Sequence, residues 1–265
     1  MMLSLRSISK YFHRGTPNEI RALDNVSLEV AEGDFVTMIG SNGAGKSTLL
    51  GTISGLALPD AGTIALDGRD ITRAPPFRRA AAIGRIAQDP GDSVCAGMTI
   101  EENLAMAARR GQTRGLRRAV TAAAGAHFKQ VLAAIGLGLE TRLAVRVGTL
   151  SGGQRQALAL QMATLSGARL LLLDEHLAAL DPRIAETVMT LTARLVSERR
   201  LTTLMVTHRM QDAIRWGNRL VMMHAGRIIF EARDAAKAAL TVDALVAKFH
   251  QAGGDLNEDR VLLAP

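Results

Sequence analysis

The sequence predicts an α/β fold in which a mixed, mainly parallel sheet carries a phosphate-binding loop. A glycine-rich segment at 40–47 stands between an apolar run and a helical pattern. Two further apolar runs, "ARLLLLDE" at 168–175 and "TTLMVTH" at 202–208, are typical of parallel strands covered on both faces. Between about 90 and 165 the apolar spacing becomes helical, which indicates an inserted helical part.

The first quarter of the chain is expected to be rich in strands. "VSLEV" at 26–30 alternates apolar and polar residues, and "GDFVTMIG" at 33–40 has the character of a buried strand entering the loop. "KSTLLGTISG" at 46–55 predicts a helix that leaves the loop. "TIALDGRDI" at 63–71 predicts a hairpin that turns at Asp67–Gly68. We therefore expect an N-terminal antiparallel β subdomain.

Helical patterns dominate the middle and the end of the chain. Thr99 has the position of a helix N-cap, with Glu101 and Glu102 in the first turn. "LVMMHAGRIIFEA" at 220–232 predicts a closing hairpin, and a basic, glycine-containing connection lies at 109–118. A polar end follows the last helix. The helices are expected at about 99–110, 119–135, 183–200 and 241–251.

Composition excludes several classes of protein. No stretch of about 18 consecutive apolar residues occurs, and the N-terminus lacks a secretory signal, so no membrane span or export is expected. The one cysteine, Cys95, permits no internal disulfide and fits a reducing cytosol. The net charge of +7 suits an anionic partner, such as nucleic acid, lipid headgroups or an acidic protein face. Aromatic residues are only 3%, which argues against a surface that stacks bases. An arginine-rich and alanine-rich composition without a nucleic-acid partner is the favoured interpretation.

The glycine-rich segment fits the phosphate-loop pattern G-x-x-x-x-G-K-[ST] at every fixed position. Glycines let backbone N–H groups turn toward phosphates, the lysine reaches the β- and γ-phosphates, and the serine hydroxyl is a ligand for Mg²⁺. No Asn-Lys-x-Asp or Thr-Lys-x-Asp occurs, which disfavours a guanine-specific GTPase. The expected nucleotide-binding residues are Gly40, Ser41, Asn42, Gly43, Ala44, Gly45, Lys46, Ser47 and Thr48.

Two acids follow the apolar run that begins at 168. Asp174 and Glu175 would stand at the carboxyl end of a strand, where α/β folds bind ligands. Asp174 is expected to support Mg²⁺, directly or through water. Glu175 is expected to orient or deprotonate an attacking water.

The stretch "LSGGQRQ" at 150–156 discriminates best among phosphate-loop proteins. Ser151 and Gln154 have the spacing of a capping box, so Gly152 and Gly153 would lie at an exposed helix N-terminus. Two glycines in a first turn weaken a helix unless something approaches closely. The pattern therefore predicts a second anion site in the same chain.

With this stretch, the chain resembles the ATP-binding cassette (ABC) family over about residues 3–232. The resemblance implies ATP and Mg²⁺, and a head-to-tail dimer in which Ser151, Gly152, Gly153 and Gln154 of one subunit cover the γ-phosphate bound by the other. It also implies roles for single residues. These are Tyr11 for stacking on adenine, Gln88 for sensing Mg²⁺ and the membrane partner, Asp181 for crossing to the other subunit, and His208 for contacting the γ-phosphate.

The same resemblance implies a division of the chain. One ABC ATPase domain would cover 1–232, with 1–89 and 166–232 as the catalytic core and 90–165 as the helical signature insert. A helical extension would follow at 233–265. The chain departs from the family where His176 and Leu177 replace the usual Pro-Thr, which bears on the loop before Asp181.

The segment around 88–111 is similar to ATPase subunits of bacterial importers that work with a periplasmic binding protein. The leading interpretation is a peripheral ATPase at the cytoplasmic face of the inner membrane. It would act as a dimer bound to separate permease subunits and import a small, amino-acid-like solute. The alternative is a non-transport ABC ATPase that acts on a soluble partner, for example of the cluster-assembly type. A P-loop kinase would leave the stretch at 150–156 unexplained.

Overall fold

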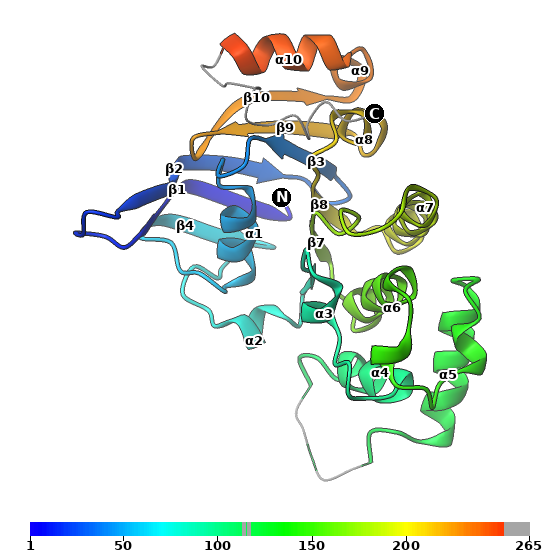
Figure 1. The fold of residues 1–265 in the computed structure, drawn as a ribbon. Helices are drawn as coiled ribbons and strands as arrows, with labels where there is room; N and C mark the ends of the chain where they lie inside the picture. The colour runs from blue at the N-terminus through cyan, green and yellow to red at the C-terminus, as the bar shows by residue number, and fades with distance from the viewer. Residues whose placement is uncertain (113–114, 116–117, 252–265) are drawn as a thin grey trace. The chain divides into compact units, whose positions relative to one another are not determined.

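The computed structural model describes residues 1–112, 115 and 118–251 (Figure 1). The chain divides into two compact units. The first contains Met1–Arg79 and the segment from Leu201 onward, and the second contains Ala80–Arg200. No helix among the described residues is long and apolar enough to cross a membrane.

The first unit contains an antiparallel sheet in the order β2-β1-β4-β5. In β2, Val26, Leu28 and Val30 are buried whereas Ser27 and Glu29 are exposed, so the alternation in the sequence gives the sheet one apolar face. The hairpin between β4 and β5 turns at Asp67–Gly68, as predicted. The strands are β1 (Leu3–Phe12), β2 (Ile20–Val30), β4 (Ala61–Leu66) and β5 (Arg69–Asp70).

The first unit also contains the strands that carry the phosphate loop. β3 (Phe35–Gly40) lies between β8 (Thr202–Val206) and β9 (Arg219–His224), and both pairs are parallel. β10 (Arg227–Arg233) closes the predicted hairpin antiparallel to β9. β3 and β8 are buried along their whole length, which explains their continuous apolar runs.

Helices of the first unit complete its core. α8 and α10 pack against each other, and Met210, Leu245 and Phe249 of these helices join Ile39 of β3 in one buried cluster. This cluster ties the predicted C-terminal helix to the strand that enters the phosphate loop. The helices are α1 (Lys46–Ser54), α2 (Pro76–Arg79), α8 (Met210–Arg215), α9 (Asp234–Ala238) and α10 (Val242–Gln251).

The second unit combines a parallel strand pair with helices. β6 (Ile83–Ile86) pairs with β7 (Leu170–Asp174), and α6 packs against α4, α7 and β6. Residues 156–164 of α6 are buried on every side, which makes it the central helix of this unit. The helices are α3 (Pro90–Ser93), α4 (Ile100–Ala108), α5 (Ala122–Ala133), α6 (Gly152–Leu165) and α7 (Pro182–Arg199).

The structure confirms most of the predicted elements and adds two strands that were not predicted. Thr99 caps α4 in a capping box with Glu102, as its position indicated. β1 and β6 had no clear pattern in the sequence. The connection predicted at 109–118 lies partly outside the described residues, and the polar end at 252–265 lies wholly outside them.

Lys237 provides a test of how the end of α8 is held. Its side chain is 2% exposed, and its ammonium donates to the carbonyl oxygens of Ile214 (3.1 Å), Trp216 and Gly217 (2.7 Å). Lys237→Met is therefore expected to lower the free energy of unfolding by about 3 kcal/mol, because three acceptors lose their donor. Chemical denaturation measures this loss.

The matched control is Lys129→Met, which removes an exposed lysine from α5. It should change the free energy of unfolding by less than about 0.5 kcal/mol. Equal stability of the two variants would contradict the capping role of Lys237.

Candidate nucleotide-binding site

The phosphate loop connects β3 to α1, and its glycines are required by its backbone. Gly40 and Gly45 have φ values of 153° and 94°. A Cβ atom at Gly40 would lie 2.1 Å from the carbonyl oxygen of Met223, and one at Gly45 would lie 2.3 Å from that of Ala22. Neither position accepts a side chain without a backbone shift.

Lys46 points back over the loop that precedes it. Its ammonium donates to the carbonyl oxygens of Gly40 and Ser41, each at 2.8 Å, and the residue is 6% exposed. No described side chain caps the N-terminus of α1, where Gly45 is the N-cap. A helix N-terminus and a buried ammonium thus flank the same loop, which is the arrangement that binds phosphate groups.

The other end of α1 is held by Arg79. Its Nη1 donates to the carbonyl oxygens of Thr52 (2.7 Å) and Ile53 (2.8 Å), and the side chain is buried. These carbonyls belong to the last turn of α1, where the helix carries a partial negative charge. The positive guanidinium interacts favourably with that charge. Arg79 therefore fixes the helix that leaves the phosphate loop.

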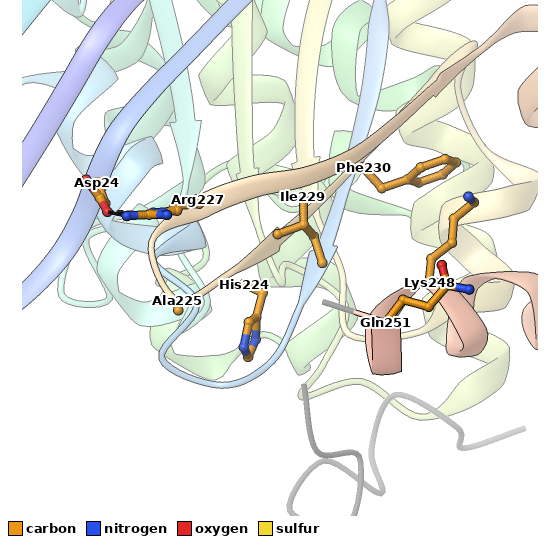
Figure 2. A pocket seen from close by; sticks show the side chains of 8 residues that line it. All are labelled: Asp24, His224, Ala225, Arg227, Ile229, Phe230, Lys248 and Gln251. Atoms are coloured by element: carbon orange, nitrogen blue, oxygen red, sulfur yellow. Dashed lines mark hydrogen bonds and ion pairs between the residues drawn. The ribbon is translucent and has the colours of Figure 1, made fainter. Parts of the chain in front are cut away.

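The β9–β10 hairpin contacts the phosphate loop directly. His224 Nδ1 lies 3.4 Å from Ser41 Oγ, and the Gly226 N–H donates to the Ala44 carbonyl oxygen at 3.1 Å. The His224 ring also meets Phe249 of α10 edge-on, with centroids 5.4 Å apart. His224 and Lys248 line a cavity of about 710 Å³, and Figure 2 shows both side chains among those that line it.

In the second unit, three predicted residues lie together at the carboxyl ends of β6 and β7. β7 ends at Asp174, which is 4% exposed, and Glu175 follows with φ 46°. Gln88 Nε2 donates to Glu175 Oε2 at 3.2 Å. Arg85 Nη2 lies 3.6 Å from Asp174 Oδ2. The parallel pairing of the two strands brings these side chains to one edge.

The signature stretch begins α6 with the predicted capping box, which joins Ser151 to Gln154. Gly152 is half-buried, but Gly153 is buried, so the expectation of two exposed glycines was wrong for Gly153. A Cβ atom at Gly153 would lie 2.2 Å from Ile184 Cγ2 of α7. Close helix packing within the chain therefore accounts for the second glycine.

The remaining predicted residues lie at the ends of elements. Tyr11 is near the end of β1, with the guanidinium groups of Arg14 and Arg21 at 5.1 and 5.5 Å from its ring centroid. His208 follows β8, and Asp181 is the N-cap of α7, where it accepts from the Ile184 N–H at 3.1 Å. Tyr11, the phosphate loop and His208 thus belong to the first unit. The signature, Gln88, Asp174, Glu175 and Asp181 belong to the second.

His176, the departure noted in the sequence, is buried directly after Glu175. Its Nε2 lies 3.4 Å from Thr192 Oγ1, and that hydroxyl donates to the Val188 carbonyl oxygen at 2.8 Å. Since the hydroxyl proton is already used, the imidazole Nε2–H is the donor to Thr192. This contact attaches the loop after β7 to α7.

Burial lowers the pKa of His176 to about 3. Between pH 7 and 5 the unfolded chain takes up a proton at this imidazole and the folded protein does not, so stability falls as the pH falls. We expect His176 to contribute about 2 kcal/mol to that decrease.

Urea unfolding at pH 7 and pH 5 tests this contribution. The variant His176→Gln should lose about 2 kcal/mol less than the wild type over this range. The exposed residue His127 offers a control, since His127→Gln should keep the wild-type decrease. If His176→Gln loses as much stability between pH 7 and pH 5 as the wild type, the folded protein takes up a proton at this imidazole as the unfolded chain does.

Three residues of this site were not found from the sequence. Arg79, Arg85 and His224 carry no motif, and each matters only through a contact with a distant segment. Arg85 could be placed near Asp174 only by knowing the register in which β6 pairs with β7. Cys95 is a free thiol and is exposed.

Comparison with known proteins identifies the family. The model of the ABC transporter family matches residues 23–178. The tyrosine transport ATP-binding protein of Clostridioides difficile is 41% identical over 253 residues, covering 95% of this chain and all of that protein. The sulfate/thiosulfate import ATP-binding protein CysA of Mycobacterium bovis is 38% identical over 78% of this chain, which spans 56% of that protein's length.

Solved structures agree with these relatives. The ATP-binding cassette MJ0796, solved as a dimer in a post-hydrolysis state with ADP and Pi, is 27% identical with a TM-score of 0.75. The match covers 88% of this chain and 98% of that one. The ATP-binding cassette MJ1267, solved in its ADP conformation, is 26% identical with a TM-score of 0.77, over 94% and 98% of the two chains. This chain therefore belongs to the ABC transporter family and is one of its ATPase cassettes.

Proposed function

We propose that this chain is the ATP-hydrolysing subunit of a bacterial importer for an amino-acid-like solute. The observation that carries the proposal is the 41% identity, over nearly the whole chain, to a protein named for tyrosine transport. The N-terminus of α1, which has no side-chain cap, and the signature stretch at the start of α6 support a cassette that uses ATP.

The predicted site residues receive roles in this proposal. The phosphate loop, from Gly40 to Thr48, binds the phosphates, and Tyr11 stacks on adenine. Glu175 positions and deprotonates the attacking water, and Gln88 holds the Glu175 carboxylate, consistent with their 3.2 Å contact. His208 contacts the γ-phosphate. We further propose that 1–89 and 166–232 act as the catalytic core, 90–165 as the helical insert and 233–265 as an extension.

The proposal includes Mg²⁺, and the donor types fit it. Mg²⁺ prefers oxygen ligands, and Asp174 and Ser47 offer a carboxylate and a hydroxyl. Among the described residues no group of three or more His, Cys, Asp or Glu side chains is arranged to hold a metal. Phosphate oxygens and water would therefore complete the coordination, as is usual for this ion. When bound, Mg²⁺ neutralises charge on the phosphates.

The proposed partners follow from the relatives. MJ0796 forms dimers, and we propose that a second copy of this chain covers the ATP with Ser151, Gly152, Gly153, Gln154 and Asp181. The relatives named for tyrosine transport and sulfate import support permease subunits as further partners. A periplasmic substrate-binding protein completes the proposed importer, and the cassette works at the cytoplasmic face of the inner membrane.

Uptake by cells tests the proposal. Deleting the gene should abolish the uptake of one labelled amino acid, with tyrosine tested first, and leave sulfate and thiamine uptake unchanged. Pull-down of the tagged chain from detergent extracts should recover a polytopic membrane protein. Recovery of soluble partners alone, with all uptake intact, would favour a non-transport ABC ATPase.

A further inference from the structure

Arg85 occupies an unusual place beside Asp174. It lies on β6 opposite Leu172 of β7, so its side chain is on the face that Asp174, two residues further along β7, also uses. Arg85 Nη2 is 3.6 Å from Asp174 Oδ2. The two side chains are 29% and 6% exposed. A guanidinium thus stands next to a carboxylate that is almost wholly removed from water.

The guanidinium of Arg85 is not fully satisfied by this contact. Its Nε is buried and has no hydrogen-bond partner among the described residues. The separation of 3.6 Å is also longer than that of a charge-assisted hydrogen bond, which is about 2.8 Å. Arg85 is therefore held near Asp174 mainly by charge, and such a contact is easier to exchange for another cation than a bidentate pair would be.

We propose that Arg85 is an internal cation that competes with Mg²⁺ for Asp174 and thereby sets the magnesium requirement of this cassette. The inference rests on the proposed function, because that function assigns Asp174 to the metal. A divalent cation arriving at this carboxylate meets the positive charge of Arg85 nearby, in a place that water screens poorly. Arg85 must withdraw from Asp174 for the metal to bind at full strength. Without metal, its positive charge stays beside the buried carboxylate.

Calorimetric titration of Mg²⁺ tests the competition without any turnover. The protein is first saturated with a non-hydrolysable ATP analogue. Arg85→Met should bind Mg²⁺ about three- to tenfold more tightly than the wild type, because the competing charge is gone. Arg85→Lys keeps a cation and should stay within about twofold of the wild type. Arg146→Met removes an exposed arginine of the same unit and serves as the matched control for net charge.

A thermal shift supplies a second readout. Arg85→Met leaves Asp174 without this partner, so the metal-free variant should unfold at a lower temperature than the wild type. Added Mg²⁺ should raise its Tm by more than it raises that of the wild type. Unchanged or weaker Mg²⁺ affinity in folded Arg85→Met would overturn the proposal.

Asp174→Asn separates this inference from the function on which it rests. If Asp174→Asn leaves Mg²⁺ affinity unchanged, the assignment of the metal to Asp174 fails. If Asp174→Asn weakens Mg²⁺ binding but Arg85→Met does not strengthen it, only the competition by Arg85 fails. In the double variant, Arg85→Met should no longer improve Mg²⁺ affinity.

Discussion

Glu175→Gln is expected to lower the rate of ATP hydrolysis by at least about a hundredfold while ATP still binds. A glutamine has nearly the same shape as the glutamate but accepts no proton from water, and general-base catalysis typically contributes 10²- to 10⁴-fold. The phosphate loop lies elsewhere in the sequence and keeps its geometry, so the Kd for ATP should change by less than about threefold.

Two measurements separate catalysis from binding in this variant. Phosphate release gives kcat, and fluorescence of a labelled ATP analogue gives Kd. Because the bound ATP is no longer consumed, the variant should also accumulate an ATP-dependent dimer, which size-exclusion chromatography with light scattering detects. Turnover close to that of the wild type would mean that another group activates the water.

The control for Glu175→Gln is Glu198→Gln, which replaces a carboxylate of α7 that is 61% exposed. It makes the same chemical change at the surface of the same unit and should leave kcat unchanged. The contact with Gln88 adds a second check. Gln88→Ala removes the 3.2 Å hydrogen bond to Glu175 and should lower kcat by less than Glu175→Gln does, because the base itself remains.

Segments in which the apolar residues follow one regular pattern were predictable from the sequence. β2 alternates strictly from Val26 to Val30, because only one of its faces is buried. β3 and β7 are continuous apolar runs, because both of their faces are buried. β1 was not predictable, because register shifts after Leu5, Ile8 and Lys10 break the alternation. Alternation of apolar and polar residues predicts a strand only where that strand pairs with its neighbour without register shifts.

Side chains of the site were predictable where a motif contains both partners. The capping box of Ser151 and Gln154 spans four residues, so the sequence alone specifies it. The burial of Gly153 against Ile184 depends on how α6 packs on α7, and the Arg85–Asp174 pair depends on the register of β6 with β7. Neither arrangement leaves a signal in the local sequence.

Ser151→Arg is expected to abolish the ATP-dependent dimer while a single subunit still binds ATP. Ser151 is exposed at the N-terminus of α6, the surface that is proposed to cover the γ-phosphate of the other subunit. An arginine there adds a long side chain where the partner's nucleotide must fit. The substitution changes no residue of the phosphate loop, so the Kd for ATP should stay within about threefold.

The dimer is measured best in a Glu175→Gln background, where hydrolysis does not remove the ATP. Adding Ser151→Arg should convert the ATP-bound dimer to monomer in light scattering, and in the wild-type background it should lower kcat by at least about a hundredfold. Ser151→Ala is the control for the lost cap. It removes the hydroxyl that accepts from the Gln154 N–H and should cost about 1 kcal/mol of stability without blocking the dimer.

The pair of variants separates two explanations of a loss of activity. If Ser151→Ala and Ser151→Arg lose activity equally, the capping of α6 matters and steric access does not. If Ser151→Arg keeps both the dimer and hydrolysis, the signature does not face nucleotide, and each phosphate loop works alone. Loss in Ser151→Arg only, with ATP binding intact, means that the loop at Gly40–Ser47 is half of a site whose other half comes from a second subunit.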